Sequence, residues 1–150
     1  MKHLLFRCAE IEETVAKIYR VLADVPAYSD TLQNFWIEMA CDEDDHAQQL
    51  KLAARISGEN VIGEEHIPLA KIESLLREAK SYLTRLQQGA VSAEKALQLT
   101  CLLEEKFLQA HINTAATFKD PQTKKMFQSL AEGDRLHVER LQSFMATRNA

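Results

Sequence analysis

The feature of this sequence that most restricts the fold is an apolar helical stripe, Leu32–Ala53, that a glutamate and a histidine interrupt. Residues three or four apart lie on one face of a helix, so Glu43 and His46 point in the direction of the apolar side chains. A carboxylate and an imidazole at core-facing positions cost free energy unless a partner compensates them. Glu-x-x-His is also a metal-ligand spacing on helices that line a bundle core. We therefore look for matching ligands elsewhere in the chain.

Composition favours a helical protein. The chain has 150 residues, of which 46% are hydrophobic, and it contains only four glycines and three prolines. Few helix breakers, with charged residues every few positions, are typical of a mostly helical domain. We expect an all-α fold and a single domain that spans residues 1–150. The net charge of −4 and a sequence pI near 5.7 argue against a nucleic-acid partner.

The three cysteines, Cys8, Cys41 and Cys101, are widely spaced and form no C-x-x-C pair. This spacing argues against a disulfide framework, a zinc ribbon and an iron–sulfur site, and we expect all three to be reduced residues on the core side. The apolar run in residues 1–7 is too short for a signal peptide, and no segment has the length of a transmembrane helix. We therefore expect a cytoplasmic protein without a membrane partner.

Hydrophobic periodicity and capping residues predict four long core helices and one connecting helix. The core helices are expected at residues 3–24, 30–57, 92–118 and 121–145. Residues 58–91 are expected to form a crossover connection, with a loop that contains Gly58 and Gly63 and a helix that follows Pro68. A long crossover between two helix pairs is one of the known bundle topologies.

The other three core helices also carry polar residues inside their apolar stripes. Glu12 interrupts the first helix and Glu104 interrupts the third. Asp134 and His137 interrupt the fourth helix with the same three-residue spacing as the motif in the second helix. Any of these residues alone could be a boundary residue that reaches solvent, so their common pattern carries the argument.

An internal repeat relates these positions to one another. A shift of 92 residues superposes the first and third core helices, and a shift of 91 residues superposes the second and fourth. The aligned pairs are Glu12 with Glu104, Glu43 with Asp134, His46 with His137, and Trp36 with Phe127. Two antiparallel helix pairs related by a pseudo-twofold axis would bring all six polar side chains to the middle of one four-helix bundle.

Such a cluster has a chemical reason to exist if it binds metal. Four buried carboxylates repel one another and lose hydration worth several kcal/mol each. Two divalent cations would balance the four negative charges and leave one neutral imidazole for each ion. Carboxylate and imidazole ligands suit iron or manganese, and this ligand set also accepts zinc.

The ordered set of motifs resembles the ferritin-like superfamily, and within it the rubrerythrin-type di-iron carboxylate proteins. The resemblance covers nearly the whole chain. It rests on Glu12 with Tyr19 seven residues later, Glu43-x-x-His46, Glu104, and Asp134-x-x-His137. It implies an antiparallel four-helix bundle made of two helix pairs, with a long crossover that contains an extra helix.

The resemblance further implies a di-iron oxidoreductase, of peroxidase or ferroxidase type, in which two iron ions react with O2 or H2O2. Its role would be protection against oxidative stress or the handling of ferrous iron. The sequence lacks the paired C-x-x-C knuckles of a rubredoxin domain, so electrons would come from a separate donor protein. We also expect a homodimer. Two alternatives stay open: iron storage of the ferritin type, and a metal-free helical interaction module.

The chain departs from the family pattern at two positions. Asp134 replaces a glutamate, so its carboxylate stops one methylene short and should hold the second metal more weakly than Glu43 holds the first. Phe107 stands where rubrerythrins carry a further glutamate, which weakens the case for rubrerythrin-type peroxidase activity. Tyr19 and His111 lie seven residues after Glu12 and Glu104 respectively. We expect Tyr19 to bond a ligand carboxylate, and His111 to bond a ligand or to add one.

Overall fold

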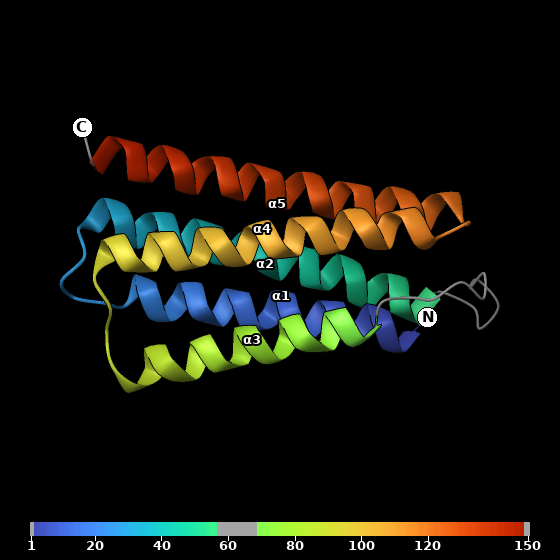
Figure 1. Ribbon diagram of the computed structural model, residues 1–150, viewed down its shortest axis with the longest axis horizontal. Coiled ribbons are helices and arrows are strands. Elements are labelled where there is room, and N and C mark those ends of the chain that lie inside the picture. The colour runs from blue at the N-terminus through green and yellow to red at the C-terminus, as the bar shows by residue number, and fades with distance from the viewer. Residues whose placement is uncertain (1, 57–68, 149–150) are drawn as a thin grey trace. The chain divides into compact units, whose positions relative to one another are not determined.

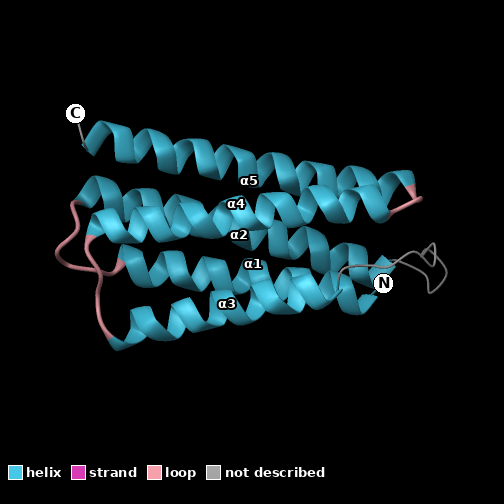
Figure 2. Cartoon of the chain, viewed as in Figure 1, coloured by secondary structure: helices cyan, strands magenta, loops and turns pink. Residues whose placement is uncertain are grey.

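The computed structural model describes residues 2–56 and 69–148, and these residues form helices joined by short turns, without a strand (Figures 1 and 2). The helices are α1 (Lys2–Ala23), α2 (Asp30–Ile56), α3 (Leu69–Gln88), α4 (Ala93–Thr117) and α5 (Pro121–Arg148). The prediction of an all-α chain is confirmed, and the helices begin and end within a few residues of the expected positions. The loop predicted around Gly58 and Gly63 lies outside the described residues.

Capping side chains mark the starts of three of these helices. Ser29 and Ser92 accept hydrogen bonds from backbone amides three residues later, at 3.3 and 3.2 Å, at the starts of α2 and α4. Asp120 does the same for α5 at 2.8 Å, directly before Pro121. These side chains satisfy amides that have no partner within the helix, so local chemistry sets the starts of α2, α4 and α5.

The chain divides into two compact units. Among the described residues, the first unit contains α1, α2 and α3, and the second contains α4 and α5. In the first unit α1 packs against both α2 and α3 (Figure 1). The crossover helix α3 therefore belongs structurally to the first helix pair.

Apolar burial and polar contacts both attach α3 to the first unit. Ile72 and Leu75 are buried on α3. Glu10 of α1 pairs with Lys80 of α3 at 2.6 Å, although exposed pairs of this kind contribute at most about 1 kcal/mol. The Tyr28 hydroxyl, in the turn after α1, donates a hydrogen bond of 2.6 Å to the carbonyl of Val91 beyond the end of α3.

The second unit is an antiparallel helix hairpin. The ring of Phe118, in the turn after α4, stacks on Phe127 of α5 with centroids 5.2 Å apart. Leu97 and Phe107 of α4 and Leu141 of α5 are buried along the hairpin. The stacked rings fix the turn end of the hairpin, and the buried leucines extend the core along both helices.

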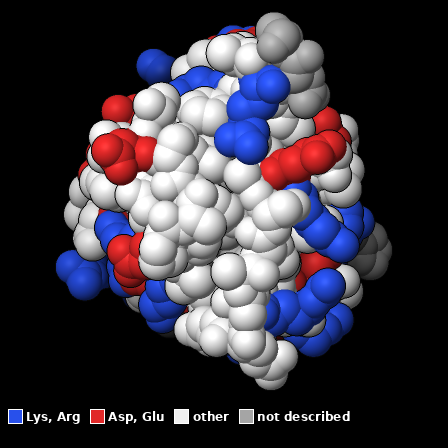
Figure 3. Space-filling model, turned by 90° about the vertical axis from the view of Figure 1, so that its left-hand side faces the viewer, with Lys and Arg blue, Asp and Glu red and all other residues white. Residues whose placement is uncertain are grey.

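The expectation that all three cysteines lie on the core side is wrong for Cys41, which is exposed, while Cys8 and Cys101 are buried. The reason is helical geometry, because Cys41 is two positions from the buried Met39 and so points away from its face. The described helices include none that is long and apolar enough to cross a membrane. On the face drawn in Figure 3, acidic and basic side chains are interspersed, and neither sign dominates.

Candidate metal centre

The first unit brings together the three ligand residues predicted in its helices, and we call this group the first half-site. Glu12 comes from α1, and Glu43 and His46 come from α2. The side chains of Glu12, Glu43 and His46 are 3%, 1% and 14% exposed. The Nδ1 atom of His46 lies 3.1 Å from Glu43 Oε2 and 3.9 Å from Glu12 Oε2. One imidazole nitrogen therefore faces carboxylates from two helices.

These carboxylates change the protonation of the histidine. Burial by itself lowers the pKa of His46, but the contacts with Glu12 and Glu43 outweigh burial and raise the pKa to about 11. Without metal, His46 is therefore an imidazolium at neutral pH, and it partly balances the charge of the two carboxylates. A metal ion that binds Nδ1 must displace this proton.

The second unit brings together the three predicted ligands of its helices and one further histidine, and we call this group the second half-site. Glu104 and His111 come from α4, and Asp134 and His137 come from α5; all four are at most 3% exposed. His137 Nδ1 lies 3.4 Å from Glu104 Oε1. His111 Nδ1 lies 2.5 Å from Asp134 Oδ2. Each imidazole thus faces a carboxylate on the opposite helix of the hairpin.

Each half-site has an aromatic contact at the positions that the internal repeat aligns. In the first unit, Tyr19 stacks on Trp36 with ring centroids 5.4 Å apart. In the second unit, the equivalent residues His111 and Phe127 are in contact with centroids 5.9 Å apart. The repeat read from the sequence therefore extends to side-chain packing. The ring of Tyr19 packs in the core as predicted, at 1% exposure.

The donor sets fit a divalent cation. The described residues whose carboxylate or imidazole atoms could hold a metal ion are Glu12, Glu43, His46, Glu104, Asp134 and His137. Buried carboxylates in contact with imidazoles from a second helix or a neighbouring turn offer oxygen and nitrogen donors with little solvent competition. This chemistry matches iron, manganese and zinc, and lacks the thiolates that copper(I) or iron–sulfur clusters select.

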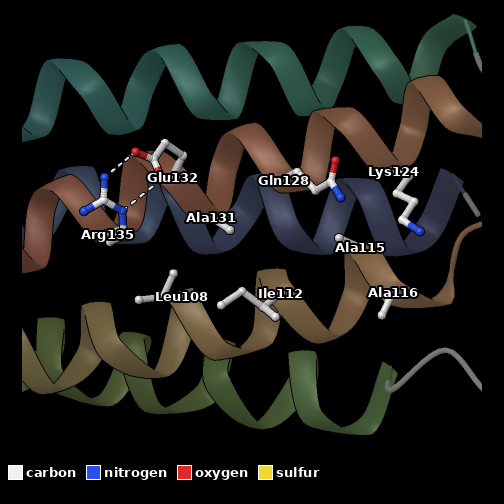
Figure 4. Close-up of a pocket in the computed structure, with 9 residues that line it drawn as sticks. All are labelled: Leu108, Ile112, Ala115, Ala116, Lys124, Gln128, Ala131, Glu132 and Arg135. Atoms are coloured by element: carbon white, nitrogen blue, oxygen red, sulfur yellow. Dashed lines mark hydrogen bonds and ion pairs between the residues drawn. The ribbon is translucent and has the colours of Figure 1, made fainter.

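Sequence periodicity did not predict a groove on the second unit (Figure 4). This cavity of about 400 Å³ has an apolar floor from α4 and α5 that includes Leu108, Ile112 and Ala131. Lys124 lines one end, and the ion pair of Arg135 with Glu132 lines the other. Periodicity placed Leu108 and Ala131 on the inner faces of their helices, so it gave no signal of a groove beside them.

Comparisons with protein-family models, with characterised proteins and with solved structures found no match to this chain. The functional assignment therefore rests on the residues of the two half-sites.

Proposed function

We propose that the two half-sites face each other within one ferritin-like four-helix bundle and hold two iron ions, and that the protein is an oxidoreductase that acts on O2 or H2O2. One observation carries the proposal. At positions that an internal sequence repeat makes equivalent, both units bury a glutamate carboxylate within 4 Å of an imidazole Nδ1, at 3.9 Å for His46 with Glu12 and 3.4 Å for His137 with Glu104. A chain gains little stability from burying such groups twice unless a ligand compensates them.

In this proposal each half-site supplies one coordination shell. Glu43 and His46 would hold the first ion, and Asp134 and His137 the second. Glu12 and Glu104, from the other two helices, would bind or bridge the ions. Four carboxylates balance two divalent cations, and the raised pKa of His46 means that loading the first ion releases a proton at neutral pH.

If two ferrous ions are bound, the chemistry they would supply is two electrons, which together with two protons reduce hydrogen peroxide to two waters. The chain contributes the surroundings of this reaction. The carboxylates of both half-sites are almost fully buried, so water competes poorly for the metal positions. The Tyr19 ring lies seven residues from Glu12 and closes the first unit's core by stacking on Trp36. A separate donor protein would return the electrons.

Anaerobic titration with ferrous iron tests the proposal. We expect about two iron ions per chain, and an absorbance change when peroxide is added. Glu43→Ala should lose iron while its helical circular-dichroism signal stays intact. The matched control is Asp45→Ala, which removes an exposed carboxylate two residues away on the same helix. Unchanged iron content in Glu43→Ala would contradict the proposal.

The same protein sample separates the alternatives. A small oligomer on a sizing column favours the enzyme, whereas a large hollow shell would indicate iron storage. We propose a homodimer, and because α3 packs against α1, such a dimer would need a surface other than the buried face of α3. A metal-free interaction module would show no rise in melting temperature with iron, because a ligand at 100 times its Kd stabilises a folded protein by about 2.7 kcal/mol.

A further inference from the structure

We propose that His111 is an additional metal ligand, so that the second half-site binds its ion through two imidazoles where the first half-site uses one. This inference rests on the proposed function, since it concerns the same metal centre. His111 lies outside both the Glu-x-x-His motif and its shortened copy.

The position of His111 supports a ligand role. Its side chain is buried on α4, and its Nδ1 atom lies 2.5 Å from Asp134 Oδ2 on α5. The corresponding contacts of the predicted ligands are longer, at 3.1 Å for His46 with Glu43 and 3.4 Å for His137 with Glu104. His111 therefore lies at least as close to a predicted ligand carboxylate as His46 and His137 do.

The second half-site differs from the first at two aligned positions of the internal repeat. Relative to Glu43, Asp134 lacks one methylene, so its carboxylate reaches less far from the helix. Relative to Tyr19, His111 carries a ring nitrogen that faces this shorter carboxylate. The internal repeat aligns both pairs of residues. The shorter carboxylate of Asp134 and the added ring nitrogen of His111 thus occur together and face each other. This pairing is expected if the imidazole of His111 compensates for the shorter reach of Asp134 as a ligand.

An imidazole beside a carboxylate can also act by positioning it, through an N–H that donates to the carboxylate oxygen. Both roles predict weaker metal binding after substitution, because loss of an outer-shell partner alone costs about 10–100-fold in affinity. The roles differ in the number of nitrogen atoms that surround the metal. The decisive measurement is therefore a count of coordinated imidazoles.

The extra nitrogen has a consequence for metal preference. Affinity for nitrogen donors rises along the first-row series towards copper, and imidazole suits zinc well. The second half-site should therefore take up zinc or cobalt before the first half-site, whose donors are two carboxylates and one imidazole. A single equivalent of zinc would report mainly on the second half-site.

The experiment is X-ray absorption on the full chain loaded with one equivalent of zinc, in which imidazole at a zinc–nitrogen distance of about 2.0–2.1 Å gives a distinct scattering pattern. We expect two imidazoles per zinc in the wild type and one in His111→Asn. Asparagine keeps an amide N–H near the place of Nδ1, so the positioning hydrogen bond survives and only the ligand is lost. His111→Gln is the second variant if the first loses its helical signal.

His3→Asn is the control, because it removes an imidazole whose side chain is 63% exposed and should leave the count at two. One imidazole in the wild type, or equal counts in the wild type and both His111 variants, would overturn the ligand role and leave the proposed function standing. A wild-type chain that binds neither zinc nor iron would overturn both proposals together.

Discussion

The two half-sites have the same plan and differ in how histidine is used. In the first, the single His46 lies between two carboxylates, Glu12 and Glu43, which hold a proton on it. In the second, each of two histidines faces one carboxylate. The position that is tyrosine in the first unit is histidine in the second.

This difference shows that a repeated helix pair can keep the places of its ligands while changing the number of donors. The first unit uses its seventh-residue position for packing, since Tyr19 stacks on Trp36. The second unit uses the same position for a polar contact and still keeps the ring contact, because His111 also touches Phe127. In the second unit, one side chain, His111, therefore makes both the ring contact and the polar contact.

The largest expected effect is on the free energy of unfolding, when the buried aromatic ring next to each half-site is removed. Trp36 and Phe127 are both fully buried, and truncating such rings to alanine costs about 3–5 kcal/mol of unfolding free energy. Each ring has two aromatic contacts, with Tyr19 and Phe35 for Trp36 and with His111 and Phe118 for Phe127. We expect the larger loss for Trp36→Ala, because the indole ring is larger and leaves the larger cavity. Urea unfolding with chelator present measures both values. Phe6→Ala, at a residue 45% exposed, is the control, and a loss as small as that of the control would contradict the packing comparison.

The next effect concerns metal affinity. Glu43→Ala removes the longer carboxylate of the half-site with one imidazole, and we expect the affinity there to fall more than about 100-fold, beyond the range of outer-shell changes. Asp134→Ala should cost less, about 10–100-fold, because His111 and His137 remain. Competition with a chromophoric chelator measures both. Equal losses in the two variants would remove the asymmetry between the half-sites.

A pH effect should be specific to the first half-site. The folded-state pKa of His46, about 11, lies above its usual value of 6.5, so the stabilisation from its imidazolium is complete below pH 6.5 and is lost as the pH rises towards 11. His46→Gln should therefore cost more stability at pH 6 than at pH 9 in metal-free protein, by at most about 1.4 kcal/mol per pH unit. His3→Gln, at a histidine of the same unit whose side chain is 63% exposed, is the control. A cost for His46→Gln that is equal at both pH values would disprove the carboxylate contacts.

The smallest effect concerns the thiols that precede Glu12 and Glu104 by about one helical turn. Burial raises the pKa of Cys8 and of Cys101, so both thiols should react slowly with a disulfide reagent at pH 8. The exposed Cys41 should react quickly, and Cys41→Ser should remove the fast phase. Rapid reaction of two or more thiols would show that one unit opens more readily than its burial indicates.

Much of the fold followed from local chemistry. The caps at Ser29, Ser92 and Asp120 were predictable because an N-cap depends on a few neighbouring residues. The error at Cys41 arose from residue type, since a small sulfur-containing side chain does not by itself define a helix face. The groove lined by Leu108 and Ile112 was not predicted. Hydrophobic periodicity identifies the buried face of a helix, but it does not indicate where two packed helices leave a groove between them.

The sequence alone determined the helices, their starts, and the four polar interruptions, because helical periodicity and repeat spacing are properties of the linear chain. Only the tertiary structure decided which groups touch. It placed the one nitrogen of His46 against carboxylates from two helices, packed α3 on α1, and brought His111 to Asp134 across the hairpin. The physical reason is that contact between helices depends on their packing and on side-chain reach in three dimensions, which spacing along one helix does not encode.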